Sequence, residues 1–569
     1  MNDHKTNTLH FSMTTLAYAL IFLVTLGLRF ALLGHHPLND QEANLALQAL
    51  ALSKGEQAVL TGQAGYVSLT AVNFFVFGAF NFMARFWPAL IGTLAVLLPL
   101  LFRPWLGRKT ALLLAALIAI DPVLIGASRT ADGSTLAMVG LMAGVGFFLM
   151  RKPLLSGVCL GASLAGGAEI WIGALLLILL FFIGRASLVN PTTDTPVEFP
   201  KRLWGTTAIT AGVSLIVIST TFFTHPVGIS AVGASLGDML AALGEIDGAA
   251  LLGISAAWLW MELPLVLLAL WALIDGLLKN ESLTRWLGLW WGLALVLAVI
   301  TPAIGVNHFH WMSIPILILA AIKLGAIFQH QTVENRLVFI AESVVVGALI
   351  VFSCMNLLAL VNNVYFTPEE TRNRIIGTLL PLILLVIMTI LLSWGWSVTD
   401  TRKGFITGML LIFAFAAFSN TWKASGLGSR PQFELSTGAS YATGTAPLMT
   451  TIADISRWNT GHSDRIDILL VGVDLPSLEW ALRDFERVSR DSGYNPNLSP
   501  SLIVTGIDRN ITSSTSYRGQ KFLWSVKPDL TALNLGDWIK WATFRTAPVQ
   551  KDDLILWARN DLFSGSTTP

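Results

Sequence analysis

The side chains best suited to chemistry are charged residues and histidines at the ends of long apolar segments. Asp40 and Glu42 follow the first apolar segment, and Arg129 and Asp132 follow a later one. An acid at a bilayer surface that is backed by apolar helices is partly desolvated, so it can act as a general base toward a hydroxyl group or hold a metal ion. These four residues are our first candidates for a functional site.

Further loops on the same predicted side of the membrane add candidates. The turn "GGAEIWIG" contains Glu169, and the stretch "TPAIGVNHFHWMSIP" contains His308 and His310. Asp121 lies deeper, within an apolar run and before Pro122, where an acid is either functional or the cap of a broken helix. A lone histidine is more often a satisfied surface residue than a ligand. The shared side of these loops is therefore the stronger reason to expect that they line one cavity.

Local structure offers another explanation of the same residues. Asn39 and Glu42 have the spacing of a capping box, and Asp40 would lie in the first helical turn, where the helix dipole favours an acid. Arg129 and Asp132 are three residues apart, so they could form an ion pair that anchors a helix end. Both explanations are kept open.

The composition is that of a membrane protein with many spans. Of 569 residues, 54% are hydrophobic and 12% are charged, whereas in soluble domains about a quarter of all residues are charged. The mean hydropathy is +0.66. The net charge of +1 gives no indication of nucleic-acid binding. Cys159 and Cys354 both lie in apolar runs, which argues against a disulfide framework and a cysteine metal site.

About thirteen apolar segments are long enough to cross a bilayer. We expect the first to be a retained helix, because no clear small-residue cleavage site follows it. Apart from Arg372 and Arg374, clusters of Lys and Arg fall on every second loop, which predicts a cytoplasmic N-terminus and an extracytoplasmic C-terminal tail in the plasma membrane. The segments are 12–33, 86–103, 110–127, 133–150, 154–168, 170–184, 204–224, 253–277, 286–302, 311–328, 337–360, 376–396 and 404–421.

The tail differs in composition from the rest of the chain. Residues 1–421 form the predicted transmembrane domain, whose first outer loop at 34–85 carries amphipathic helices, and 422–445 is a linker rich in Gly, Ser and Thr. In 446–569, the predicted strands "RIDILLVG" and "PSLIVTGI" flank the helix "SLEWALRDFERVSRD", and "LGDWIKWATFR" and "DDLILWAR" follow. Alternating strands and helices predict a small extracytoplasmic α/β domain. It lacks a glycine-rich phosphate loop, so we interpret it as a lid or docking domain.

The order of these features resembles a known group of membrane enzymes. A first span, an acidic outer loop, the segment "FNFMARFWPALIGTLAVLLPLLFR" and the Ser128–Arg129 turn before Asp132 are similar to the GT-C membrane glycosyltransferases. The likeness is to the group of protein O-mannosyltransferases and lipid A aminoarabinose transferases. In the tail, "LEWALRDFERV" and "GDWIKWATFRT" resemble the C-terminal domain of Chloroflexi-type flippase-activity-associated proteins. The predicted fold class is a polytopic α-helical, GT-C-like membrane protein with a small C-terminal α/β domain.

This resemblance implies transfer of a sugar from a polyprenyl-phosphate-linked donor to a protein, lipid or glycan acceptor at the outer membrane face. Asp40 would be the base or the acceptor-orienting group, and Glu42 its partner. Relatives usually carry an Asp-Glu pair where this chain has Gln41 and Glu42, with Asp40 one residue earlier. Either Asp40 takes over the role on a slightly rotated helix, or catalysis is lost or altered.

The resemblance also implies which residues bind the donor. Arg129, with His308 or His310, would stabilise the lipid phosphate that leaves, a role that suits the forked donors of Arg. Asp132 matches the same family turn, whereas Glu169 lies where relatives commonly have a Lys. No redox cofactor is implied. A divalent metal is left open but has no support in the sequence, because no cluster of three or more acids has the spacing of metal ligands.

Two other functions are compatible with the same features. A non-catalytic GT-C-like scaffold or partner subunit would bind lipid-linked glycans or membrane proteins, and Gln41 favours it. A flippase or transporter would need more charged residues at mid-membrane than Asp121, Glu262 and Glu342. Sugar transfer that requires intact acids would identify the enzyme, and substrate movement without transfer would identify the flippase.

Overall fold

The computed structural model describes residues 13–188, 200–242, 248–300, 309–329, 333–362, 367–428, 430–435, 439–495, 498–509, 511 and 515–563. Most of these residues are helical, and a five-stranded sheet lies near the C-terminal end of the chain. The prediction of a polytopic α-helical protein with a small C-terminal sheet domain is therefore confirmed.

Long apolar helices make up most of the molecule. Within the described residues, nine helical segments are long and apolar enough to cross a membrane, and a bent pair would bring the number to ten. The nine contain α1 (Met13–Phe30), α4 (Asn81–Leu94) continued by η1 (Ala95–Leu97) and α5 (Leu98–Leu101), α12 (Lys201–Ser219), α14 (Gly248–Leu278), α15 (Ser282–Ile300), α16 (Phe309–Gln329), α17 (Arg336–Asn362), α18 (Pro368–Gly395) and α19 (Val398–Ala424).

Most of the remaining helices are shorter. Several of the thirteen predicted spans correspond to those that precede α19, and the others belong to the tail. The bent pair is α7 (Arg108–Ile120) and α8 (Pro122–Ser128), which meet at 58°. The others are α2 (Asp40–Ser53), α3 (Ala64–Phe77), α6 (Arg103–Leu106), α9 (Ser134–Leu149), α10 (Pro153–Leu164), α11 (Glu169–Leu188), α13 (Gly228–Ala241), η4 (Pro431–Phe433), α20 (Thr445–Thr460), α21 (Pro476–Ala481), α22 (Leu535–Phe544) and η5 (Asn560–Leu562).

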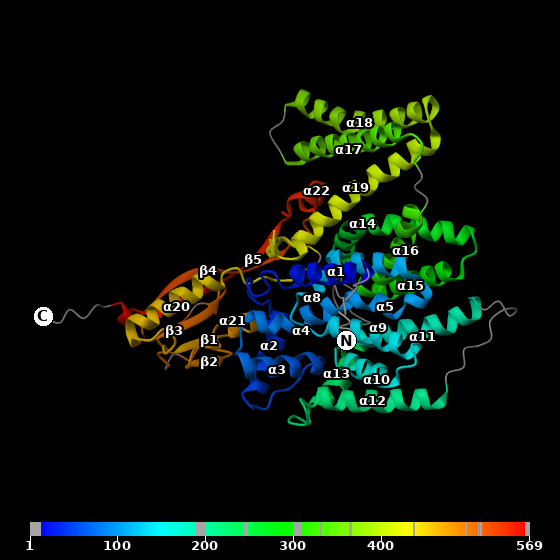
Figure 1. Ribbon diagram of the computed structural model, residues 1–569. Helices are drawn as coiled ribbons and strands as arrows, with labels where there is room; N and C mark the ends of the chain where they lie inside the picture. Colours follow the sequence, from blue (N-terminus) through cyan, green and yellow to red (C-terminus); the bar gives the residue numbers. More distant parts are fainter. Residues whose placement is uncertain are drawn as a thin grey trace, which may run out of the picture.

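Figure 1 shows how these parts are arranged. Most helices form one large body, α17 and α18 lie together on one side of it, and the sheet projects from another side, next to α2 and α3. The α19 helix runs from the α17–α18 pair back to the main body. It contacts both α8 and α14 there, so its C-terminal end reaches the centre of the molecule.

The bundle core is built from aliphatic side chains and three buried tryptophans, Trp258, Trp290 and Trp311. Trp311 of α16 packs directly on Gly173 of α11, where a Cβ atom would come within 2.2 Å of the indole ring. Because interiors are close-packed, only glycine allows this approach of the two helices. The contact places the N-terminal end of α16, which carries His310, against α11.

The sheet domain is a mixed sheet with strand order β2-β1-β3-β5-β4. Its strands are β1 (Ile468–Val471), β2 (Val488–Asp491), β3 (Leu502–Gly506), β4 (Tyr517–Pro528) and β5 (Val549–Arg559). The β1 strand pairs in parallel with β2 and β3, whereas β5 is antiparallel to β3 and β4. The long β4–β5 hairpin carries α22 at its tip, and α22 contacts α17 of the bundle.

The helix predicted over "SLEWALRDFERVSRD" is wrong in its second half. The helix α21 ends at Ala481, and Val488–Asp491 forms the edge strand β2. Val488 lies opposite Ile468 in the parallel register, so pairing with β1 overrides the local helical pattern. The strand β4 was absent from the sequence-based prediction.

Candidate functional site

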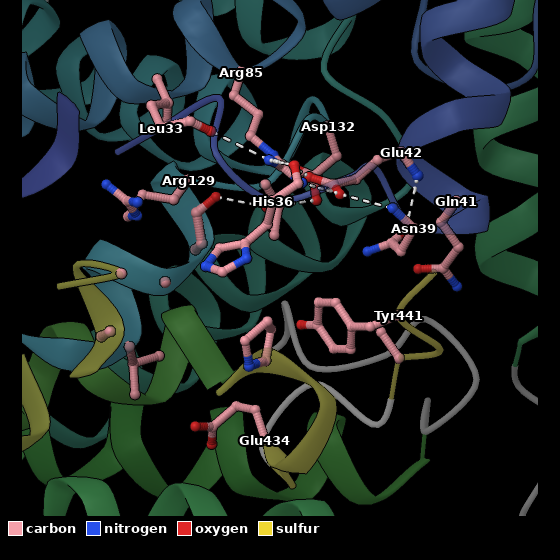
Figure 2. A pocket seen from close by; sticks show the side chains of 18 of the residues that line it. Leu33, His36, Asn39, Gln41, Glu42, Arg85, Arg129, Asp132, Glu434 and Tyr441 are labelled. Atoms are coloured by element: carbon pink, nitrogen blue, oxygen red, sulfur yellow. Dashed lines mark hydrogen bonds and ion pairs between the residues drawn. The ribbon is translucent and has the colours of Figure 1, made fainter. Parts of the chain in front are cut away.

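A cavity of about 490 Å³ lies where the ends of the helices meet the sheet domain. Its wall includes residues of the first loop and α2, the α8–α9 turn, and the starts of α11 and α16. The tail contributes the segment around Glu434 and Tyr441, and Arg545 from the end of α22. Figure 2 shows Asn39, Gln41 and Arg85 on one side of this space, with Tyr441 and Glu434 across from them.

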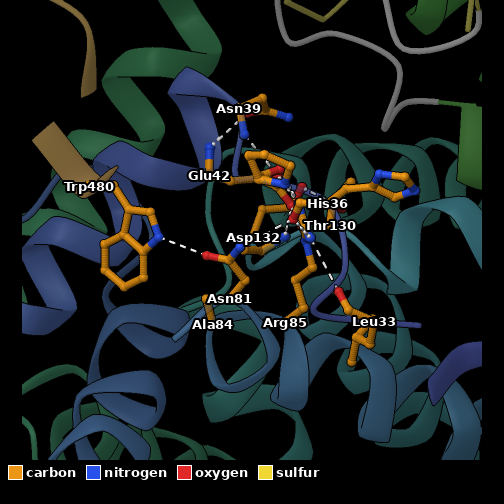
Figure 3. Close-up of polar contacts among 12 residues, drawn as sticks. Leu33, His36, Asn39, Glu42, Asn81, Ala84, Arg85, Thr130, Asp132 and Trp480 are labelled. Carbon is orange, nitrogen blue, oxygen red and sulfur yellow. Dashed lines mark hydrogen bonds and ion pairs between the residues drawn. The ribbon is translucent and has the colours of Figure 1, made fainter. Parts of the chain in front are cut away.

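A buried ion pair holds the first loop in place at this cavity. Nε of Arg85 donates to Oε1 of Glu42 at 2.8 Å, and Nη2 donates to Oε2 at 2.6 Å. The side chains are only 7% and 5% exposed. Arg85 also donates to the carbonyls of Leu33, His36 and Pro37, so one guanidinium fixes the chain between α1 and α2 (Figure 3).

The Glu42 carboxylate is satisfied by further partners. The backbone N–H of Ala131 donates to Oε1 at 2.9 Å, and that of Asn39 donates to Oε2 at 3.1 Å. The predicted capping box of Asn39 and Glu42 is confirmed. Burial by itself raises the pKa of Glu42, but Arg85 and the N–H donors outweigh it and hold that pKa below its ordinary value. Glu42 is therefore charged at neutral pH and bonded on both oxygens.

Asp40 lies outside the cavity wall, although its neighbours Asn39 and Gln41 both line it. Its Oδ1 atom accepts hydrogen bonds from the backbone N–H of Ser477 at 3.0 Å and from the Ser477 hydroxyl at 2.5 Å. Ser477 belongs to α21 of the sheet domain. The structure thus places the first candidate acid at a contact between the first loop and the tail.

Arg129 lines the cavity at the end of α8. Its Nη1 donates to the carbonyls of Leu28 and Arg29 at 3.2 and 2.8 Å, which tie the guanidinium to the end of α1. Burial, with a smaller effect of Arg85, lowers the pKa of Arg129 to about 10, so it stays protonated at neutral pH. Gly426 approaches it so closely that a Cβ there would lie 2.6 Å from Nη2.

Three other predicted residues also line this cavity: Asp132, Glu169 and His310. Asp132 accepts bonds from the Ser134 backbone N–H and hydroxyl and from the Thr130 hydroxyl. Glu169 and His310 are almost fully buried. The structure therefore brings Glu42, Arg129, Asp132, Glu169 and His310 into one wall, whereas His308 lies outside the described residues.

Asp121 caps the broken helix, as one of its two interpretations predicted. Its Oδ1 accepts the backbone N–H of Leu124 at 2.7 Å at the start of α8. Pro122 and Val123, which follow it, line the cavity. The break between α7 and α8 thus directs the Arg129 turn toward the cavity.

Several cavity residues were missed from the sequence. They are His36, Arg85, Lys423, Glu434, Tyr441 and Arg545. Arg85 gave a signal in retrospect, because a lone Arg inside a span needs a buried acid. The residues of the tail gave none, since only the tertiary fold brings them to the first loop. Burial lowers the pKa of His36, and Arg85, His35 and Arg129 add to this effect, so His36 is neutral at pH 7.

The cavity therefore combines cations, carboxylates and side-chain amides. Arg129, Lys423 and Arg545 can bind an anionic group, and Asp132 can accept a proton or orient a hydroxyl. Among the described residues, no group of three or more His, Cys, Asp and Glu side chains is arranged to hold a metal ion. This chemistry suits a substrate that carries both an anion and hydroxyl groups.

The fold is similar to that of a structurally characterised membrane protein. ArnT from Cupriavidus metallidurans bound to undecaprenyl phosphate matches with a TM-score of 0.50 and 14% sequence identity, over 87% of this chain and 94% of that chain. Its apo state matches with a TM-score of 0.49 at the same identity and coverage. No protein-family model matches the chain, and no curated protein sequence matches it.

At this identity the comparison establishes the fold. The chain is a multi-pass membrane protein with the GT-C fold, as its sequence resemblance predicted. The narrower likeness to O-mannosyltransferases or to flippase-activity-associated proteins stays a prediction.

Proposed function

We propose that this protein is a membrane glycosyltransferase that transfers a sugar from a polyprenyl-phosphate-linked donor to an acceptor hydroxyl. The observation that carries the proposal is one cavity in a GT-C fold that is lined by Arg129, His310 and Asp132 together. The related ArnT structure holds undecaprenyl phosphate. A lipid-linked donor therefore fits both the fold and the cations of the cavity.

In this proposal the Arg129 loop performs two roles. The acceptor oxygen bonds to the anomeric carbon of the sugar while the bond from that carbon to the lipid phosphate oxygen breaks. Arg129 and His310 stabilise the charge on the departing phosphate. Because hydrogen bonds to the end of α1 hold the Arg129 guanidinium in place, it needs little reorganisation during the reaction. Asp132, three residues further on, takes the acceptor proton or orients the hydroxyl. Glu169 adds an acid to the same wall.

The assignment of Asp40 and Glu42 as the catalytic pair stays a prediction. The contacts of Glu42 with Arg85 and of Asp40 with Ser477 favour bracing and docking roles for these two acids. Asp40→Asn and Glu42→Gln separate a catalytic from a structural role, because Asn and Gln keep the size of the side chain while removing its charge.

The test is transfer from a radiolabelled polyprenyl-phosphate sugar by the purified full-length protein. We expect Asp132→Asn to lower the rate about a hundredfold or more, the usual contribution of general base catalysis. Asp40→Asn and Ser477→Ala should have equal, smaller effects if Asp40 only docks the tail. A loss of transfer in Asp40→Asn alone, with a folded protein and an active Asp132→Asn, would make Asp40 the base instead.

A scaffold that binds lipid-linked glycans without transferring them is the second candidate. The observation that favours it is Gln41, an uncharged side chain that lines the cavity at the family position of an acid. Retention of the labelled donor on the protein, without transfer to any acceptor pool, would support the scaffold and contradict the enzyme.

We also propose that the N-terminus is cytoplasmic and that the sheet domain is extracytoplasmic, in the plasma membrane. The alternation of basic loops supports this orientation. Alkaline phosphatase fused after Leu562 should be active in cells, whereas a fusion after Arg108 should be inactive. The reverse pattern would contradict the orientation.

A further inference from the structure

The sheet domain places one arginine in the cavity wall. Arg545 follows α22 at the tip of the β4–β5 hairpin and has φ +50°, a left-handed conformation that is costly for any residue except glycine. It is 3% exposed, and its guanidinium lies 4.1 Å from the centre of the Trp541 ring. Its Nη2 donates to Oδ1 of Asn420 in α19 at 3.1 Å. Stacking and this hydrogen bond fix the guanidinium at the cavity.

Two donors of this buried guanidinium are not used by the described part of the chain. Within it, neither Nε nor Nη1 of Arg545 has a hydrogen-bond acceptor. Arg545 forms an ion pair with Glu434, but the distance from Nη1 to Oε1 of Glu434 is 3.7 Å, which is too long for a hydrogen bond. Buried guanidinium donors that stay without an acceptor are costly, so an anionic ligand is the expected partner.

A second cation lies next to Arg545. Lys423, near the end of α19, lines the same cavity and interacts electrostatically with Arg545 and Glu434. Its Nζ donates to the Thr543 carbonyl at 3.1 Å, which ties α19 to α22. Among the described residues, Glu434 is the acid that interacts with both Lys423 and Arg545, so two cations face one carboxylate there.

This cluster comes from different elements than the cations around Arg129. Arg129 is bonded to the end of α1 and interacts electrostatically with Arg85, whereas Lys423 and Arg545 come from α19 and α22. Two separately held cationic groups in one cavity match a ligand with two anionic groups. Phosphate is the anion that suits both a forked guanidinium and a lysine.

We propose that Arg545 and Lys423 form a second phosphate subsite, so that the donor is a polyprenyl diphosphate-linked rather than a monophosphate-linked sugar. One phosphate binds at Arg129, and the other replaces Glu434 as the partner of Arg545. This inference rests on the proposed donor-binding function and names its substrate class.

The test compares the binding of polyprenyl monophosphate and polyprenyl diphosphate, of equal chain length, to the full-length protein in nanodiscs. We expect the wild type to bind the diphosphate about tenfold more tightly, the effect of one charge-assisted hydrogen bond. Arg545→Gln and Lys423→Gln should each remove most of this preference and leave monophosphate affinity unchanged within about twofold. Arg129→Gln should weaken the binding of both lipids. The exposed Lys551, in the same domain, gives the matched control Lys551→Gln.

A variant that binds polyprenyl diphosphate more tightly than the wild type does cannot owe this effect to a folding defect. Glu434→Gln removes the acid that faces Arg545, and it should strengthen diphosphate binding while monophosphate binding stays the same. Equal affinity of the wild type for the two lipids would overturn the inference and leave the proposed function intact. If the wild type binds neither lipid, this inference and the proposed function are both overturned. If free inorganic pyrophosphate displaces bound polyprenyl diphosphate as effectively as added polyprenyl diphosphate does, the assignment of the subsite to a lipid-linked ligand is overturned.

Discussion

The buried pair of Glu42 and Arg85 determines how the first loop lies on the bundle. The carboxylate accepts four hydrogen bonds, two from Arg85 and two from backbone N–H groups. Because both charges are removed from water, loss of one partner leaves the other charge uncompensated. The sequence made this acid a candidate for catalysis. Its four hydrogen bonds explain it as a structural residue that holds the first loop in place.

Removal of one partner should therefore destabilise the protein strongly. We expect Glu42→Gln and Arg85→Gln each to cost about 3–5 kcal/mol, the usual penalty for breaking a buried pair. Thermal unfolding in detergent measures the change. The matched control is Arg457→Gln, whose pair with Asp454 is 63% and 64% exposed, and it should cost no more than about 1 kcal/mol. If Arg457→Gln destabilises the protein as much as Glu42→Gln or Arg85→Gln does, the bracing role is contradicted.

The same pair predicts a pH dependence. The folded pKa of Glu42 is lowered, so its stabilising contribution is fully present above the unfolded pKa of about 4.3 and is lost as pH falls through the folded value. The difference in stability between the wild type and Glu42→Gln should be constant from neutral pH to about pH 5 and shrink in more acidic solution. Unfolding curves across this range check it, and a difference that grows on acidification would contradict the assignment.

At the scale of elements, the end of α19 limits where Arg129 can lie. Gly426 follows this helix with φ +79°, and a Cβ there would lie 2.6 Å from Nη2 of Arg129. The glycine therefore allows both the left-handed turn and the close approach of the guanidinium. The turn couples the tail linker to the proposed phosphate-binding residue.

Gly426→Ala should displace Arg129 and weaken the binding of polyprenyl phosphate about tenfold, through the loss of one charge-assisted bond. Gly461→Ala is the matched control, because Gly461 has φ +74° and its Cβ would meet nothing within 4 Å. Both variants carry similar backbone strain, so only the contact with Arg129 distinguishes them. Comparable affinities of the two variants in nanodiscs would contradict this role of Gly426.

Local signals explain which elements the sequence predicted well. The capping box of α2 and the cap at Asp121 depend on residues within one turn, and both are present in the structure. The strand β2 and the wall residue Arg545 depend on partners far along the chain, namely β1 and Asn420. No periodicity in their own segments reports such contacts, so the tail half of the cavity was not predictable.

At the scale of the whole molecule, the described part of the tail contacts the bundle through two of its helices. One is α22, through Arg545 and the buried Trp541. The other is α21, where Ser477 binds Asp40 and the indole N–H of Trp480 donates to Oδ1 of Asn81 at 2.8 Å (Figure 3). The Trp480 ring also lies 5.6 Å from that of Phe74 in α3. The sheet domain thus completes the cavity as part of its wall.

Trp480→Ala should release the α21 contact while the bundle and the sheet stay folded. Trp480 is 3% exposed, and buried aromatic residues at the centre of an interface contribute about 2 kcal/mol or more. We expect faster cleavage between bundle and sheet in limited proteolysis, together with weaker binding of polyprenyl diphosphate, because Tyr441 and Arg545 lose their fixed positions. Trp458→Ala, at a tryptophan of the same domain that is 83% exposed, should change neither. If Trp480→Ala leaves lipid affinity at the wild-type value while cleavage accelerates, the sheet domain covers the cavity without taking part in binding.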